Sequence, residues 1–319
     1  MKSWAVILMF VFFTKARSQG YTVQAAFTLH EVPAVIEGMT YDPKDKNFYF
    51  GESLTFRILR YSSGGRPAGY IDGAKDGITS ILGMSVFLPL HHLWVCGSIQ
   101  QAGRKTMCLF QYNLETGKLI NRFPDTSGKA LLFNDVAITA DGSVYATDTY
   151  TRSLYKTDTV TKSAILYLQS DSLKDCNGIT ADGNVLFVST SRGFARINTA
   201  EKSLTLTNLA NFMIAGIDGL YLYQQSLIGI QNVFFPVTVA RYFLDPDGKN
   251  ITDARMIAVA HPSFDIPTTG AIVNDHFYFM ANSNIGHFNP ENKKLDSGKI
   301  KKVAVVKIPL ARKSRRQVL

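Results

Sequence analysis

Four oxygen-bearing residues recur at related places in the chain and together could bind a cation. They are Glu37, Asn134, Asn177 and Asp218, and three of them directly precede a glycine. Two carboxylates balance the charge of a divalent ion, while amide oxygens complete its coordination without adding charge. Because none of these positions carries sulfur or imidazole, the donor set favours calcium, with magnesium, manganese and zinc as alternatives.

The same dipeptides are also common turn sequences that need no ligand. Asn-Asp, Asn-Gly and Asp-Gly begin many turns, because short polar side chains hydrogen-bond to the local backbone and glycine accepts unusual backbone angles. The interpretation as a metal site therefore depends on all four residues having the same position in a repeat.

Six segments of the sequence share one pattern. Each begins with a polar residue or glycine, continues as a short apolar strand, turns at Asp, Gly or Asn, and ends as a second apolar strand. They open at Glu37, Gly83, Asn134, Asn177, Asp218 and Gly270. Successive openings are 46, 51, 43, 41 and 52 residues apart. A period in the forties with several short strands is typical of a propeller blade, so the sequence predicts an all-β, six-bladed β-propeller with four-stranded blades.

This architecture predicts how the ring closes and where the opening residues lie. Residues 21–29 would complete the blade formed by the C-terminal strands, including 303–308, which leaves few strand edges unpaired. The opening residue of each unit begins the innermost strand, so the four oxygen-bearing residues should converge at one mouth of the central channel. A second ring at the same mouth is expected from Glu52, Asp148, Asn232 and Asn282, either supporting the site or capping strand ends.

The first residues have the form of an export signal. Lys2 is followed by an apolar run at 4–13 and by Ala16-Arg17-Ser18, a cleavage signal, and the run is too short to span a bilayer. We predict a signal peptide at 1–18, the propeller at 19–310 and a basic C-terminal tail at 311–319. The protein is accordingly expected to be secreted or periplasmic.

The charge distribution argues against a polyanionic partner. The formal net charge is +9, but ten basic residues lie in the first 18 and last 19 positions, so residues 19–300 carry −1. A nearly neutral body has no basic face to follow phosphates, and we expect no nucleic-acid partner. No apolar run after the leader is long enough for a membrane span. We expect a monomer that acts on a small molecule.

Cysteines and histidines form no recognised metal or redox motif. The sequence has no CxxC and no Cys/His cluster, which argues against a structural zinc or redox centre. Cys96 and Cys108 flank an expected hairpin turn at 100–105, where a symmetric register would place them opposite each other; a disulfide and two free thiols both remain open. None of the six histidines is at an opening position, and His91-His92 is expected in a solvated turn.

The ordered motifs resemble a known family. They are Glu37-Gly38, Phe133-Asn134-Asp135, Asn177-Gly178 and Asp218-Gly219. Together they resemble the gluconolactonase and regucalcin (senescence marker protein) family, and more distantly the paraoxonases and strictosidine synthases, over nearly the whole chain after the leader. The resemblance implies that Glu37, Asn177 and Asp218 are metal ligands and that Asn134 contacts the metal or the substrate.

Two positions depart from the family pattern. Gly38-Met39 stands where the family usually has Gly-Pro. The second unit opens with Leu82-Gly83-Met84, where the paraoxonases carry a histidine. The second departure argues against a histidine mechanism of the paraoxonase type.

The activity implied by the resemblance is hydrolysis of a lactone or related cyclic ester. The cation would polarise the carbonyl group, Asp218 would act as ligand and proton acceptor, and Asn134 would hydrogen-bond to a substrate oxygen. The sequence has no Gly-x-Ser-x-Gly, His-Glu-x-x-His or phosphate-binding glycine motif, so covalent catalysis is not expected. The alternative is a non-catalytic propeller that binds a sugar, peptide or protein partner and contains calcium as a structural ion.

Overall fold

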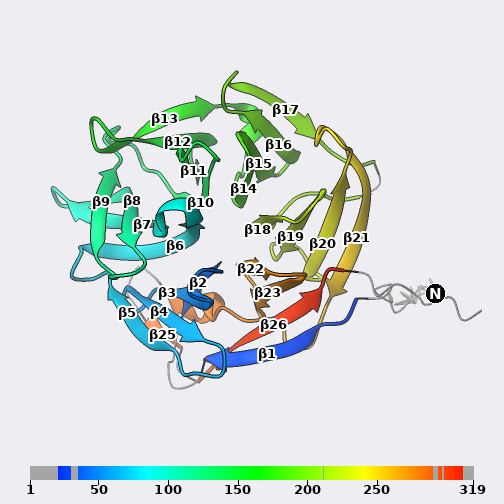
Figure 1. Ribbon diagram of the computed structural model, residues 1–319, viewed down its shortest axis with the longest axis horizontal. Coiled ribbons are helices and arrows are strands. Elements are labelled where there is room, and N and C mark those ends of the chain that lie inside the picture. Colours follow the sequence, from blue (N-terminus) through cyan, green and yellow to red (C-terminus); the bar gives the residue numbers. More distant parts are fainter. Residues whose placement is uncertain (1–20, 30–34, 211, 290–293, 297, 312–319) are drawn as a thin grey trace, which may run out of the picture.

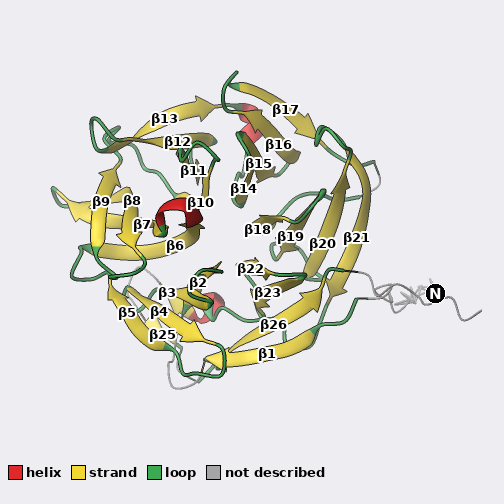
Figure 2. Cartoon of the chain, viewed as in Figure 1, coloured by secondary structure: helices red, strands yellow, loops and turns green. Residues whose placement is uncertain are grey.

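A computed structural model describes residues 21–29, 35–210, 212–289, 294–296 and 298–311. The described residues form a six-bladed β-propeller around a central channel (Figure 1). Strands dominate it, and its helical segments are the 3-10 turns η1 (Leu88–Leu90), η2 (Asp171–Leu173) and η3 (Ile285–His287) (Figure 2). Within these ranges, no helix has the length and apolar character needed to cross a membrane. The predicted signal peptide (1–18) and all but the first residue of the predicted tail (311–319) lie outside the described residues.

Each of the first five blades is built from four consecutive antiparallel strands. Blade 1 contains β2 (Ile36–Asp42), β3 (Asn47–Glu52), β4 (Arg57–Ser62) and β5 (Ala68–Asp72). Blade 2 contains β6 (Ile78–Phe87), β7 (His92–Gln101), β8 (Arg104–Asn113) and β9 (Leu119–Pro124). Blade 3 contains β10 (Phe133–Ile138), β11 (Val144–Asp148), β12 (Ser153–Asp158) and β13 (Ser163–Gln169). Blade 4 contains β14 (Ile179–Asp182), β15 (Val185–Thr190), β16 (Gly193–Asn198) and β17 (Ser203–Thr207). Blade 5 contains β18 (Ile217–Leu222), β19 (Ser226–Gln231), β20 (Thr238–Leu244) and β21 (Ile251–Val259).

Blade 6 closes the ring with strands from both ends of the chain. It contains β22 (Gly270–Val273), β23 (His276–Met280), β26 (Val303–Pro309) and β1 (Gln24–Leu29). Its outermost strand β1 pairs antiparallel with β26, from Gln24 opposite Lys307 to Leu29 opposite Val303. A short ribbon of β24 (Phe288–Asn289) and β25 (Lys294–Leu295) lies in the connection before β26. The predicted closure by residues 21–29 is confirmed.

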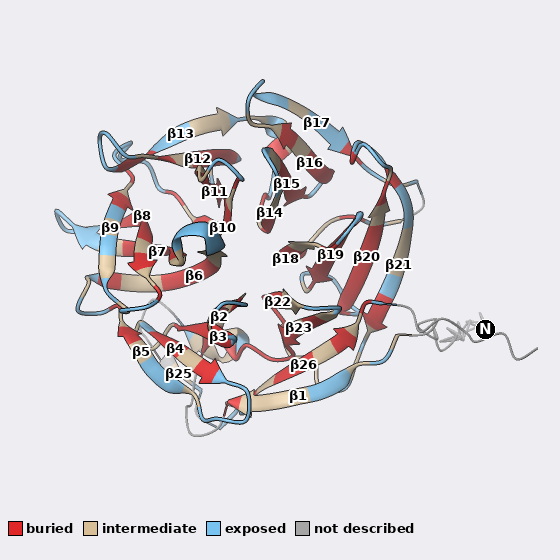
Figure 3. Ribbon diagram, viewed as in Figure 1, coloured by how far each residue is buried: buried red, intermediate tan, exposed pale blue. Residues whose placement is uncertain are grey.

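The hydrophobic core is divided among the six contacts between neighbouring blades. Each buried cluster combines side chains from two adjacent blades. In β11, for example, Val144 and Ala146 pack toward blade 2, whereas Tyr145 packs toward blade 4. Because successive side chains of a strand point to opposite faces and both faces are covered, the middle strands are apolar at consecutive positions. The outer strands β13, β17 and β21 are more exposed (Figure 3).

The register of β7 and β8 rules out the predicted disulfide alternative. Cys96 lies opposite Leu109, and Cys108 lies opposite Gly97. A one-residue offset places two side chains on opposite faces of the sheet. Accordingly Cys96 packs between blades 2 and 3 and Cys108 between blades 1 and 2, so both are free and buried, as is Cys176.

Candidate functional site

The four predicted site residues lie at equivalent places on four innermost strands. Glu37, Asn134 and Asp218 are the second residues of β2, β10 and β18, and Asn177 stands two residues before β14. Figure 1 shows these strands around the channel. Because every blade begins with its innermost strand, the four residues are at the same end of the channel.

Bulges in the innermost strands coincide with these residues. The pairing of β2 with β3 shifts between Ile36 and Gly38, which leaves Glu37 as the extra residue. Similar shifts occur in β10 between Phe133 and Val136, and in β18 between Ile217 and Leu220. A bulge bends its strand and re-aims the side chain at that point, and bulges are common next to active sites. The fold therefore gives these positions an orientation that a regular strand would not.

The glycines that follow the site residues allow neighbouring innermost strands to come close together. An added Cβ at Gly38 would lie 2.2 Å from the backbone oxygen of Leu82. One at Gly178 would lie 2.2 Å from the backbone oxygen of Asp218, and one at Gly219 would lie 2.7 Å from that of Thr268. The glycines of these dipeptides are therefore explained by packing near the axis, whatever the polar residue before them binds.

Asp218 is held by two asparagines from different blades. Its Oδ2 accepts a hydrogen bond of 2.7 Å from Nδ2 of Asn232, which also donates to the backbone oxygen of Pro267 at 2.9 Å. The Asn177 side chain also hydrogen-bonds to the Asp218 carboxylate. Burial raises the pKa of Asp218 to about 6, although the hydrogen bonds from Asn232 and Asn177 lower it. Asp218 therefore has a fixed orientation at the meeting point of blades 4 and 5.

Glu37 is electrostatically coupled to Asp218. Burial and, to a smaller extent, the negative charge of Asp218 raise the pKa of Glu37 to about 8, and the charge of Lys105 acts in the opposite direction. The Glu37 backbone is fixed separately, because its carbonyl oxygen accepts hydrogen bonds from the hydroxyls of Thr268 and Thr269 at 3.3 and 2.7 Å. The structure thus brings Glu37, Asn177 and Asp218 into one electrostatic group.

Asn134 is connected to this group less directly. Its Nδ2 donates to Oγ1 of Thr149 at 3.1 Å, and that hydroxyl in turn donates to the backbone oxygen of Cys176 at 2.7 Å. These two hydrogen bonds, through Thr149, therefore connect Asn134 to Cys176, the residue before Asn177. The metal-binding role of all four residues stays a prediction.

Asp135 is a channel residue that the sequence reasoning missed. Its Oδ1 accepts from the backbone N–H of Val136 at 2.9 Å and its Oδ2 from that of Ile179 at 3.2 Å. Burial raises the pKa of Asp135 to about 7, the two backbone hydrogen bonds lower it, and the charge of Asp218 raises it. A Cβ at Gly83 would lie 2.2 Å from Oδ1 of Asp135, so this carboxylate explains why blade 2 opens with glycine. In the sequence, the only indication of Asp135 was its place directly after Asn134.

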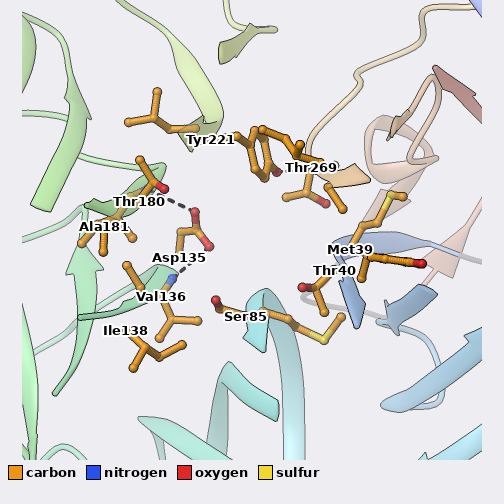
Figure 4. A pocket seen from close by; sticks show the side chains of 18 residues that line it. Met39, Thr40, Ser85, Asp135, Val136, Ile138, Thr180, Ala181, Tyr221 and Thr269 are labelled. Atoms are coloured by element: carbon orange, nitrogen blue, oxygen red, sulfur yellow. Dashed lines mark hydrogen bonds between the residues drawn. The ribbon is translucent and has the colours of Figure 1, made fainter. Parts of the chain in front are cut away.

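The central channel contains a cavity of about 250 Å³ lined by all six innermost strands. Asp135 is the one carboxylate among its lining residues and projects into it (Figure 4). Hydroxyl groups of Thr40, Ser85, Thr180 and Tyr221 also line the cavity. None of the four predicted site residues lines this cavity. The lining residues follow them along the innermost strands, from Asp135 onward in β10.

The donor set fits a hard divalent cation. Three partly buried carboxylates near the axis, Glu37, Asp135 and Asp218, have raised pKa values for which burial is the main cause. Burying several anions is costly unless protons or a cation neutralise them. Asp218 and its two hydrogen-bond partners, Asn177 and Asn232, supply carboxylate and amide oxygens of the kind that calcium prefers.

The predicted second ring divides into caps and one site residue. Glu52 accepts hydrogen bonds from the N–H groups of Leu54 and Thr55 at 2.7 and 2.8 Å, which caps a turn. Asp148 accepts from Leu132 N–H, and Asn282 connects the backbones of Lys302 and Ala304. Asn232 alone among the four bonds to a predicted ligand, Asp218. Three of the four are therefore strand-end or turn caps.

A separate acidic and histidine cluster lies at the other end of β2. Among the described residues, Asp42, Asp45 and His91 form the one group of three His, Cys, Asp or Glu side chains with ligand atoms within 4.8 Å of one another. Asp42 follows Glu37 by five residues, or about 16 Å of extended strand. His91 lies in a turn as expected, but the expectation that it is solvated is wrong, because its side chain is 12% exposed and bonds to Asp42.

Comparison with known proteins gives similarity in fold only. No protein-family model and no curated protein sequence matches this chain. The PQQ-bound aldose sugar dehydrogenase of Streptomyces coelicolor superposes with a TM-score of 0.61 at 12% identity, covering 91% of this chain and 98% of the other. Virginiamycin B lyase from Staphylococcus aureus gives a TM-score of 0.56 at 11% identity, covering 91% and 100%. The gluconolactonase XC5397 from Xanthomonas campestris gives 0.54 at 14% identity, covering 93% and 92%. The chain thus shares its propeller fold with sugar dehydrogenases, a lyase and a gluconolactonase.

Proposed function

We propose that this protein is a secreted, metal-dependent hydrolase of a small lactone or related cyclic ester, similar to the gluconolactonases of the regucalcin family. The observation that carries the proposal is the geometry at Asp218. Its carboxylate is oriented by Asn177 and Asn232 and lies within electrostatic reach of Glu37. The fold shared with a gluconolactonase is compatible with this assignment.

The residues of the site have distinct roles in this proposal. Glu37, Asn177 and Asp218 would hold the cation, with calcium favoured by the oxygen donors. When bound, a divalent cation supplies Lewis-acid polarisation of the ester carbonyl. Asp218 would accept a proton from the attacking water, and Asn232 restricts the carboxylate to one orientation for that transfer.

Asn134 would bind the substrate oxygen. The amide Nδ2 has two hydrogens, and the one hydrogen bond to Thr149 leaves the second available for a substrate acceptor. A fixed donor of this type stabilises negative charge that develops on the oxygen in the transition state.

A lactone panel tests the proposal. Purified protein would be assayed with aldonolactones and aliphatic lactones in calcium, magnesium, manganese or zinc, and again after chelation. We expect turnover that chelation abolishes and one metal restores. Calcium-dependent thermal stabilisation without turnover of any lactone would overturn the enzyme and favour the non-catalytic propeller with a structural ion.

Secretion has its own test, because residues 1–18 lie outside the described residues. Export followed by N-terminal sequencing of the mature protein should give a chain that begins at Gln19. Retention of the unprocessed chain inside cells would contradict the proposed location.

A further inference from the structure

Large apolar side chains are exposed at the end of the propeller that carries the candidate site. Phe235 is 89% exposed, Val233 and Tyr150 are each 63% exposed, Met213 is 57% exposed and Phe234 is 42% exposed. We call these five residues the apolar rim. They lie in the β11–β12 connection, the loop before β18 and the β19–β20 connection. All three loops are at the end where β10 and β18 begin, which is the end of Asn134 and Asp218.

The apolar rim is directly joined to the hydrogen bonds of the site. Val233 immediately follows Asn232, which donates to the Asp218 carboxylate at 2.7 Å. Tyr150 immediately follows Thr149, which accepts from Asn134 at 3.1 Å. Two independent loops, on blades 3 and 5, thus place an exposed apolar residue next to a residue that supports the site.

The rim is also packed in a defined way around Gly216, two residues before Asp218. An added Cβ at Gly216 would lie 2.7 Å from the ring of Phe234 and 2.9 Å from Val233. Gln231, the residue before Asn232, donates to the backbone oxygens of Met213 and Ala215 at 3.0 and 3.1 Å. These contacts hold the two loops of blade 5 side by side.

The two loops of blade 5 combine buried apolar residues, Ile214 and Val237, with exposed members of the apolar rim. Residues 212–217 and 233–237 contain only apolar residues, glycine and proline, and no charged or hydrogen-bonding side chain. Loops normally carry polar turn residues, and a group of exposed large apolar side chains at one mouth is typical of a binding surface. On blade 2, by contrast, strand β8 begins with the charged residues Arg104 and Lys105, directly after the β7–β8 turn. The mouth is therefore apolar on one side of the carboxylates and polar on another.

We propose that the apolar rim binds the aliphatic chain or aromatic ring of the substrate whose cyclic ester lies at Asp218. The preferred substrate is then a lactone with an apolar substituent rather than a polyhydroxylated aldonolactone. This inference rests on the proposed function, and it names the substrate class. The occupant is part of a small molecule, because two rim residues directly follow residues that support the site. Val233 follows Asn232, which bonds to Asp218, and Tyr150 follows Thr149, which bonds to Asn134.

Chain-length dependence tests the inference. The ratio of kcat/KM for γ-decalactone to that for γ-butyrolactone would be measured for the unmodified protein and for the double variant V233S/F235S. Burying one methylene changes binding by about fourfold, so two or three methylenes against the rim predict a ratio of about 15 to 60. The double variant should lose most of that ratio, and Met213→Ser should lose part of it.

Val160→Ser is the matched control. Val160 is 90% exposed, but it lies in the β12–β13 turn at the opposite end of the blade, so its substitution should leave the ratio unchanged. A preference that is absent, or equally strong in V233S/F235S, overturns the apolar-substrate assignment while lactonase activity stands. Loss of self-association or of vesicle binding in V233S/F235S, with an unchanged ratio, also overturns it.

A binding measurement separates this inference from the proposed function. Calorimetry with the γ-lactam that carries the same hexyl chain as γ-decalactone requires no turnover. Binding that V233S/F235S weakens by about tenfold or more supports the rim even if no lactone is hydrolysed, in which case only the proposed hydrolase fails. If V233S/F235S binds the lactam as tightly as the unmodified protein, the proposal that the apolar rim binds the substrate chain is overturned.

Discussion

Replacing Asn232 with alanine tests whether the hydrogen bond to Asp218 prepares that carboxylate for a cation. The side chain of Asn232 donates to Oδ2 of Asp218 at 2.7 Å and to the backbone oxygen of Pro267 at 2.9 Å. Alanine removes both bonds but leaves Asp218 itself in place. The variant therefore changes the orientation and basicity of a proposed ligand, not the number of ligands.

The size of the effect follows from the charge of the acceptor. A hydrogen bond to a charged group contributes about 1.5–3 kcal/mol, which corresponds to a factor of about 10 to 150. Losing a partner that orients a metal ligand typically costs about 10- to 100-fold in metal affinity. We therefore expect N232A to bind calcium about 10- to 100-fold more weakly, measured by titration calorimetry of chelator-treated protein.

Asn282→Ala provides the matched control, because Asn282 is the equivalent residue of blade 6. Its amide accepts from Ala304 N–H at 2.8 Å and donates to Lys302 oxygen at 3.1 Å. Its loss should lower the free energy of unfolding by about 1–2 kcal/mol but change calcium affinity by less than about twofold. The reasoning is refuted if N232A keeps the affinity of the unmodified protein, or if N282A weakens calcium binding equally.

Asp218→Ala removes a channel oxygen and little core packing, so calorimetry should detect no high-affinity calcium binding while circular dichroism keeps its β spectrum; retained affinity would count against the site. Asn134→Ala should lower kcat/KM for the hydrolysed lactone by about 10- to 1000-fold with much less effect on calcium affinity, and equal losses in both would make Asn134 a ligand instead. Gly178→Ala places a Cβ 2.2 Å from a backbone oxygen and should cost about 1–3 kcal/mol in urea unfolding, whereas Gly69→Ala, whose nearest neighbour is at 3.9 Å, should stay within about 0.5 kcal/mol. Because burial raises the pKa values of the axial carboxylates to about 6, 7 and 8, the folded chain binds protons that the unfolded chain has released, so chelated protein should lose thermal stability as pH rises from about 4 to 8. Saturating calcium should reverse that trend, and a flat profile in chelator would contradict it.

The number of blades and the closure of the ring could be predicted from the sequence, because each repeat is marked by local strand and turn patterns. Short β-branched and aromatic runs bounded by turn residues recur six times, and each run only has to find its neighbour in the chain. The closing pair β1–β26 was predictable for a related reason. The extended segment 21–29 precedes the first repeat, and the last blade needs one more strand to complete it. The common phase of Glu37, Asn134, Asn177 and Asp218 follows from the same repeat.

Features that depend on register or on contacts between blades could not be predicted. A shift of one residue decided that Cys96 and Cys108 face different cores. The bulges at Glu37 and at Asp218 leave no mark in the spacing of apolar residues, yet they set how these side chains are aimed.

Contacts near the axis join residues from different blades, which local sequence patterns do not describe. Gly83 in blade 2 makes room for Asp135 of blade 3, whose carboxylate then accepts a hydrogen bond from Ile179 of blade 4. The partnership of Asn232 with Asp218 could not be distinguished from the capping role of Asn282, because both residues end equivalent strands. The sequence alone determined the repeat and the positions of its polar residues. Only the tertiary structure decided which of those residues meet, because sheet register and the approach of the innermost strands at the axis set the distances between their side chains.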